Sequence, residues 1–230
     1  MRSKTLVIRN VAFAVCLLSL LAACATRTPP RFVYFDRPSD RAGVAAGRRP
    51  GHIYMFRGII WAITLGVDAF AQELREKGFD AHAYGGLIVR ASEDVVGHTV
   101  AAKIESDYAD PAKREPIVII GYSSGTVTAV AMARHLNRLH IPVDLLVTID
   151  PEVSETVPPN VRTCLNYYER KVPGVLLFSG TMMHAPSGVE LQNIRLFQPN
   201  HLTIDENPVM KASVTAWIVD LSSRAAQTRQ

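Results

Sequence analysis

A continuous run of β-branched residues near the middle of the chain constrains the fold more than any other feature. Ile117-Val118-Ile119-Ile120 follows Pro116 and ends at Gly121. Such an uninterrupted apolar run is typical of a central strand in a parallel sheet, where both faces are buried. Residues 143–149, after Pro142, are a second strand candidate of the buried type. Two such strands predict a mainly parallel sheet that helices cover on both faces.

Strand-type and helix-type segments alternate from about residue 50 to residue 222. The apolar spacing predicts strands over 52–59, 79–84, 116–121, 143–149, 162–168 and 193–197, and helices over 67–77, 93–106, 124–139 and 207–222. The chain has no internal repeat and no linker that would mark a second domain. We therefore expect residues 51–230 to form a single compact α/β domain without a large cap.

The first 23 residues have the pattern of a signal sequence. A positive start, carrying Arg2, Lys4 and Arg9, precedes an apolar stretch over 11–22 that is short for a bilayer span. The segment ends in Leu21-Ala22-Ala23-Cys24, which resembles a bacterial lipobox. The alternatives are an ordinary secretory signal and a short anchor helix with an incidental cysteine.

The lipobox resemblance implies cleavage before Cys24 and acylation of both its sulfur and its new amino end. Several acyl chains would hold the protein stably on a membrane. Ala25, rather than Asp, follows the cysteine, which favours the outer membrane of a Gram-negative envelope. We expect a lipid-anchored protein on the periplasmic face, with residues 24–50, rich in Arg, Pro, Ala and Gly, as its tether.

The cysteine content and the charge of the mature chain limit its possible partners. Of three cysteines, Cys16 lies in the signal sequence and Cys24 would be lipidated, so Cys164 cannot form an intramolecular disulfide. The formal charge of +4 includes three basic residues of the signal sequence. Without those three of the 25 Lys and Arg, 22 basic residues face 21 acidic ones. With no dense Lys/Arg run either, a nucleic-acid partner is not expected.

The candidate chemistry lies in the turn after the central strand. Gly121-Tyr122-Ser123-Ser124-Gly125 is a G-x-S-x-G between a strong strand and a strong helix, the context of a nucleophile elbow. The two glycines would relieve crowding in the turn. The following helix would offer backbone N–H groups to a developing oxyanion. The spacing makes Ser123 the nucleophile and Ser124 a backbone donor, against the plainer alternative of a Gly-Ser turn.

Here the sequence resembles the α/β-hydrolase superfamily of serine esterases, lipases and thioesterases. The resemblance is specific at Gly121–Gly125 and looser over the rest of residues 50–222. It implies a catalytic triad in the order Ser, Asp or Glu, His. It also implies an acyl ester or thioester, small or lipidic, as the substrate. No cofactor or metal is implied.

Two histidines follow the predicted elbow at a suitable distance for the base. His201 comes after the strand predicted over 193–197 and before the closing helix, in the loop where the family places its catalytic histidine. His184 lies at 181–186 without a strand directly before it. We therefore expect His201 to accept the serine proton, with His184 as the alternative.

The acid is expected at the end of the strand after the elbow. Asp150 follows Ile149 and precedes Pro151, at the carboxyl edge of the predicted sheet. This position resembles that in pancreatic-type lipases. Many α/β-hydrolases place the acid one strand later, where this chain offers Glu169 and Glu190. Asp205 comes after His201 and is out of the family's order.

The second oxyanion donor is expected after the first strand, where Gly58 allows a turn and Ile59 or Ile60 would present its N–H. Trp61 and Ile60 would line an acyl pocket or pack on the sheet. The leading hypothesis is thus a membrane-anchored serine hydrolase. Two alternatives stay open: an acyltransferase or peptidase with the same triad, and a non-catalytic envelope-binding lipoprotein with a hydrolase-like fold.

Overall fold

The structure of the chain is a computed structural model that describes residues 47–58, 65–85, 92–169, 180–197 and 201–228. All of them belong to one compact unit, Gly43–Gln230. The predicted signal sequence, Cys24 and residues 24–46 of the predicted tether lie outside the described residues. Among the helices that are described, none is long and apolar enough to cross a membrane.

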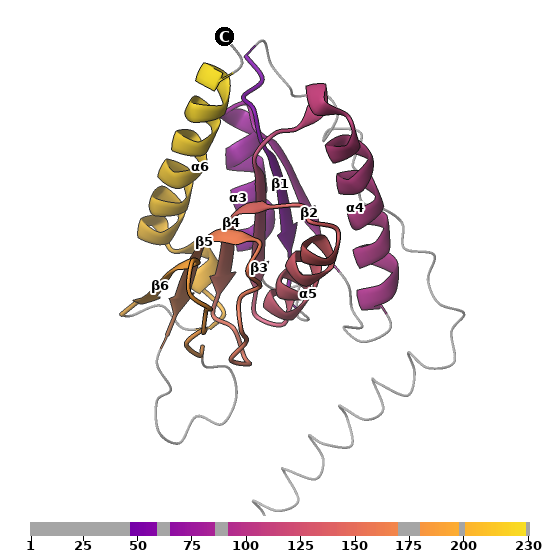
Figure 1. The fold of residues 1–230 in the computed structure, drawn as a ribbon. Helices are drawn as coiled ribbons and strands as arrows, with labels where there is room; N and C mark the ends of the chain where they lie inside the picture. Colours follow the sequence, from indigo (N-terminus) through magenta and orange to yellow (C-terminus); the bar gives the residue numbers. More distant parts are fainter. Residues whose placement is uncertain (1–46, 59–64, 86–91, 170–179, 198–200, 229–230) are drawn as a thin grey trace, which may run out of the picture. The chain divides into compact units, whose positions relative to one another are not determined.

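The described strands form one six-stranded sheet in the order β2-β1-β3-β4-β5-β6, and every neighbouring pair is parallel (Figure 1). The strands are β1 (His52–Phe56), β2 (Asp80–Tyr84), β3 (Ile117–Tyr122), β4 (Val143–Ile149), β5 (Val161–Tyr168) and β6 (Glu190–Arg195). The two strands predicted to be central, β3 and β4, lie in the middle of the sheet. Every residue of β3 is buried, as the continuous apolar run requires.

Helices cover both faces of the sheet. Helices α3 (Gly66–Glu76) and α6 (Pro208–Thr228) lie on one face, and α4 (Ser92–Ala109) and α5 (Gly125–Arg138) lie on the other (Figure 1). The alternation of β1 shows how the core is divided. Ile53 and Met55 pack towards α3 and α6, whereas Tyr54 and Phe56 pack towards α4 and α5. The predicted α/β class, parallel sheet and two covered faces are confirmed.

The element boundaries differ most from the prediction in the last part of the chain. Strand β6 is Glu190–Arg195, whereas the sequence predicted 193–197. It pairs on one side only and its residues are at most half-buried, so its sequence lacks the apolar run that marked β3 and β4. Helix α6 continues to Thr228, beyond the predicted end at 222, through a segment of helix-favouring Arg, Ala and Gln. Two short 3-10 turns, Pro111–Lys113 and Ile204–Glu206, were not predicted.

The register of β3 against β4 determines where the candidate site lies. Tyr122, the last residue of β3, pairs with Ile149, the last residue of β4. The next residues along the chain are Ser123 and Asp150, so both emerge at the same edge of the sheet from adjacent strands. Parallel strands thus place two residues that are 27 positions apart in the sequence at the same end of the core.

Candidate active site

Ser123 lies in a strained turn between β3 and α5. Its φ of 54° is in the left-handed region, which a residue with a side chain adopts only where the surroundings enforce it. A Cβ atom at Gly125 would lie 2.3 Å from the carbonyl oxygen of Phe56, and one at Gly121 would lie 2.6 Å from that of Gly125. Both glycines are therefore needed for close backbone contact, as the sequence predicted. This geometry is that of a nucleophile elbow.

The structure brings the three predicted triad side chains into one hydrogen-bonded chain. His201 Nε2 lies 2.9 Å from Ser123 Oγ, and His201 Nδ1 lies 2.6 Å from Asp150 Oδ2. All three residues are buried, Asp150 completely. Because the carboxylate accepts from Nδ1–H, the neutral imidazole presents an unprotonated Nε2 to the serine hydroxyl. The arrangement lets Ser123 give its proton to His201 while Asp150 stabilises the resulting imidazolium.

Asp150 is fixed by its surroundings on every side. Its backbone has a φ of 50°, and its N–H donates to the carbonyl of Tyr167 at 2.7 Å. Its second carboxylate oxygen accepts a hydrogen bond from the backbone N–H of Glu169 at 2.9 Å. A Cβ at Gly180 would lie only 2.0 Å from that same oxygen, so Gly180 leaves the space that the carboxylate occupies.

Neither alternative acid replaces Asp150 at His201. Glu169 contributes its backbone N–H to Asp150, and no hydrogen bond from the Glu169 side chain to His201 is present among the described contacts. Burial, followed by the nearby charge of Asp150, raises the pKa of Glu169. Glu190 lies at the start of β6, where it accepts hydrogen bonds from Thr163 and Gln192.

The alternative base, His184, lies away from the serine. Its backbone forms an isolated bridge with Thr156. Its N–H donates to Glu155, and its carbonyl accepts from Val157. The His184 side chain is exposed, whereas that of His201 is buried against Ser123.

Two further residues contact the triad, and sequence reasoning missed both. Tyr122, inside the G-x-S-x-G motif, donates its hydroxyl to the backbone carbonyl of His201 at 2.5 Å. Burial is the main cause that raises the pKa of this phenol. Glu152, two residues after Asp150, accepts a hydrogen bond from Ser123 Oγ at 2.9 Å. Its place two residues after the predicted acid is the one sequence signal that could have indicated it.

The predicted oxyanion donors are only partly described. Ser124 is the first residue after the serine and precedes α5, so its N–H belongs to the positive end of that helix. Ile59, Ile60 and Trp61 lie outside the described residues. Gly58, just before them, lies against the nucleophile: a Cβ there would be 3.0 Å from Ser123 Cβ and 3.4 Å from Oγ. The chain after β1 therefore runs past the serine hydroxyl, where a second donor is required.

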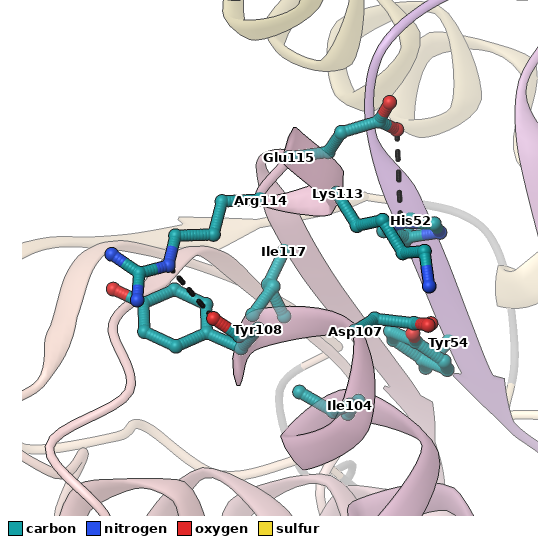
Figure 2. A pocket seen from close by; sticks show the side chains of 9 residues that line it. All are labelled: His52, Tyr54, Ile104, Asp107, Tyr108, Lys113, Arg114, Glu115 and Ile117. Carbon is teal, nitrogen blue, oxygen red and sulfur yellow. Dashed lines mark hydrogen bonds and ion pairs between the residues drawn. The ribbon is translucent and has the colours of Figure 1, made fainter. Parts of the chain in front are cut away.

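A small pocket lies at the opposite end of the sheet, lined by the amino ends of β1 and β3 and by α4 (Figure 2). Two of its polar side chains are paired with groups beside the pocket. Glu115 forms a bidentate ion pair with Arg48, and His52 Nδ1 lies 2.6 Å from Asp80. These contacts tie strand ends together. No described group of three or more His, Cys, Asp or Glu side chains could hold a metal ion.

No protein-family model and no curated protein matches the sequence. Among solved structures, the chain is similar to an esterase from Pyrobaculum calidifontis (TM-score 0.44, 14% identity, 79% of this chain and 78% of that chain covered). It is also similar to the RedJ thioesterase from Streptomyces coelicolor (TM-score 0.41, 10% identity, 74% and 86% covered). A third is an alpha/beta hydrolase superfamily protein from Enterococcus faecalis (TM-score 0.41, 8% identity, 73% and 90% covered).

Proposed function

We propose that the protein is a serine hydrolase that cleaves a carboxylic ester or thioester through an acyl-enzyme on Ser123. One observation carries this proposal: the hydrogen-bonded chain from Ser123 through His201 to Asp150, built on a strained turn between strand and helix. A structural Gly-Ser turn needs neither the positive φ of the serine nor a buried imidazole beside its hydroxyl. A buried acid–imidazole pair is instead what activates a serine hydroxyl.

The residues have the following roles in the proposed reaction. Ser123 Oγ attacks the carbonyl carbon while its proton passes to His201 Nε2, and Asp150 stabilises the imidazolium. The N–H of Ser124, with a second donor expected from Ile59 or Ile60, stabilises the oxyanion. The leaving alcohol or thiol then departs with the proton from His201. Water, deprotonated by His201, attacks the acyl-serine and releases the carboxylic acid.

Labelling with a neutral fluorophosphonate probe tests this proposal. The folded wild-type protein should be labelled, and Ser123→Ala should abolish labelling because the nucleophile is gone. Ser223→Ala is the matched control, since Ser223 lies on α6 and donates only to a carbonyl of its own helix. An unlabelled wild-type protein that hydrolyses no activated ester would overturn the proposal in favour of a binding lipoprotein.

We also propose that Cys24 is lipidated and anchors the domain on the periplasmic side of a membrane, with the outer membrane favoured. The support is the Leu21–Cys24 sequence after a short apolar stretch. Cys24→Ser should abolish incorporation of labelled palmitate and leave the precursor uncleaved. Cys16→Ser is the matched control and should be processed normally. Membrane attachment of a cleaved Cys24→Ser protein would contradict the anchor.

A further inference from the structure

Glu152 adds an acidic side chain to the proposed active site. Its carboxylate accepts a hydrogen bond from Ser123 Oγ at 2.9 Å, and its side chain is exposed. Among the described residues, no Lys, Arg or His side chain forms an ion pair with it. Three other glutamates of the described chain do form ion pairs: Glu155 with Arg134, Glu115 with Arg48, and Glu73 with Lys211. The Glu152 carboxylate instead lies at the reacting oxygen.

The hydrogen-bond geometry shows that Glu152 contacts the nucleophile without being one of the three triad residues. The serine hydroxyl has one hydrogen, yet Glu152 Oε1 and His201 Nε2 both lie 2.9 Å from Ser123 Oγ. Acylation requires that the proton move to His201. Glu152 must therefore release the hydroxyl when substrate binds. Its carboxylate then lies beside the scissile carbonyl, because that carbon bonds to the same oxygen.

The other described charges near the serine do not cancel that of Glu152. Both carboxylate oxygens of Asp150 already form hydrogen bonds, one with His201 and the other with the backbone N–H of Glu169. The charges of His201 and Arg195 act on the nearby carboxylate of Glu169, where they oppose the rise in pKa that burial causes. Arg57, next to Gly58, makes a bidentate ion pair with Asp68 on α3. Among the described residues, two carboxylates thus contact the Ser123–His201 pair, Glu152 at the hydroxyl and Asp150 at the imidazole.

We infer that Glu152 is a specificity-determining residue, and that the preferred substrates are esters or thioesters carrying a positive charge close to the scissile carbonyl. This inference rests on the proposed hydrolase function. A cation about 5 Å from an exposed carboxylate is attracted to it, and an anion at the same distance is repelled, although water weakens both effects. The expected preference for a cationic over a neutral substrate of equal shape is therefore about tenfold in kcat/KM. Added salt should reduce it.

Matched substrates that differ only in charge test this inference. One series consists of thioesters whose leaving group is thiocholine, its carbon isostere with tert-butyl in place of trimethylammonium, or a sulfonate analogue. The second series carries the same three groups on the acyl side of a nitrophenyl ester. A common reporter in each series gives kcat/KM directly. We compare the kcat/KM of the cationic substrate with that of the neutral substrate. A change in rate that affects both substrates equally leaves this ratio unchanged.

Glu152→Gln should bring that ratio close to one, because the amide keeps the shape of the side chain but removes its charge. Glu155→Gln is the matched control, since it removes a charge from the same loop that is already paired with Arg134. This control should keep the wild-type ratio. Glu152→Lys should reverse the preference and favour the anionic substrate. A preference in one series alone supports the inference and shows on which side of the carbonyl the charge lies.

Two results would overturn the inference and leave the proposed function standing. The first is labelling of Ser123 by the neutral fluorophosphonate together with equal rates on all three substrates of both series. The second is a cation preference that persists unchanged in Glu152→Gln. An unlabelled wild-type protein without turnover on any substrate would remove the hydrolase function itself. If Glu152→Gln fails to fold, the salt dependence of the wild-type ratio decides: a ratio that is high and insensitive to salt contradicts the inference.

Discussion

Tyr122 and His201 contact each other twice, through the backbone and through the rings. The phenol of Tyr122 donates to the backbone carbonyl of His201 at 2.5 Å, and the two rings stack with centroids 5.5 Å apart. Tyr122 is the residue immediately before the serine, so β3 positions both the nucleophile and the loop of its base. A displacement of β3 would move the serine and the imidazole together, which keeps their separation fixed.

Tyr122→Phe tests whether the Tyr122 hydroxyl positions His201, because the variant keeps the ring and its packing. The hydrogen bond from the Tyr122 hydroxyl to the His201 carbonyl is lost, which costs about 1 kcal/mol. We expect lower stability in urea unfolding, and about a tenfold fall in the acylation rate because His201 is held less firmly. Tyr167→Phe is the matched control, since that hydroxyl donates to Ser213 on α6. It should change acylation little. Equal losses of acylation in both variants would contradict the positioning role.

Loss of any one of the three triad residues should remove most of the activity. Ser123→Ala and His201→Ala are each expected to lower kcat on an activated ester by on the order of 10⁴–10⁶-fold, since either loss removes proton transfer from the nucleophile. Asp150→Asn should cost about 10⁴-fold, because the imidazole survives without its orienting charge. Burst kinetics on purified variants measure acylation directly.

His184→Ala supplies the control for the base. Its side chain is exposed and its loop contacts Glu155 and Val157, so we expect less than about a threefold change in acylation. An inactive His184 variant beside an active His201 variant would reverse the assignment of the base.

Gly125→Ala should destabilise the elbow. The new Cβ would lie 2.3 Å from the carbonyl of Phe56 and 2.6 Å from that of Arg57, and backbone atoms cannot move aside cheaply. We expect a loss of about 2 kcal/mol or more in unfolding free energy, together with loss of fluorophosphonate labelling.

Gly188→Ala distinguishes crowding from backbone strain. Gly188 has a φ of 95°, but a Cβ there would meet nothing within 4 Å. We expect a cost of about 1 kcal/mol with labelling retained. A comparable loss of labelling in both glycine variants would mean that the elbow is not specifically crowded.

The core of the fold was predictable because it rests on local signals. The run at 117–120 indicated a buried strand, and the glycines after it indicated the turn. The end of β4 placed Asp150 at the correct edge of the sheet. These features depend on neighbours in the sequence, and a parallel sheet converts them into one site.

The contacts that were not predictable join residues far apart in the chain. Tyr122 lies 79 positions from the residue whose carbonyl it binds, and Glu152 lies 29 positions from Ser123. No periodicity marks either pairing, since each depends on how a distant loop packs against the carboxyl edge of the sheet. The exact range of β6 was missed for a related reason, because an edge strand with half-buried residues has only a weak apolar pattern.

Asp205→Asn should stabilise the protein at neutral pH. Asp205 is buried, and neither carboxylate oxygen makes a well-aligned hydrogen bond with a described residue, although backbone N–H groups at the start of α3 lie near it. Burial, with a smaller contribution from the charge of Glu206, raises its pKa from 3.8 to about 6, while backbone N–H groups at the start of α3 partly oppose the rise. The folded state therefore binds this proton more tightly than the unfolded state does.

The sign of the pH dependence follows from that raised pKa. The favourable contribution of Asp205 is complete below about pH 4 and is lost as the pH rises through about 6, because the folded protein must then bury a charge. A shift of about two units corresponds to at most about 3 kcal/mol. Urea unfolding at about pH 5 and about pH 8 should show that Asp205→Asn gains stability chiefly at the higher pH.

Glu206→Gln should give a smaller gain in the same direction, because removing that charge makes ionisation of Asp205 less costly. An Asp205→Asn protein that is less stable than the wild type at about pH 8 would show that the ionised carboxylate is stabilised by the start of α3.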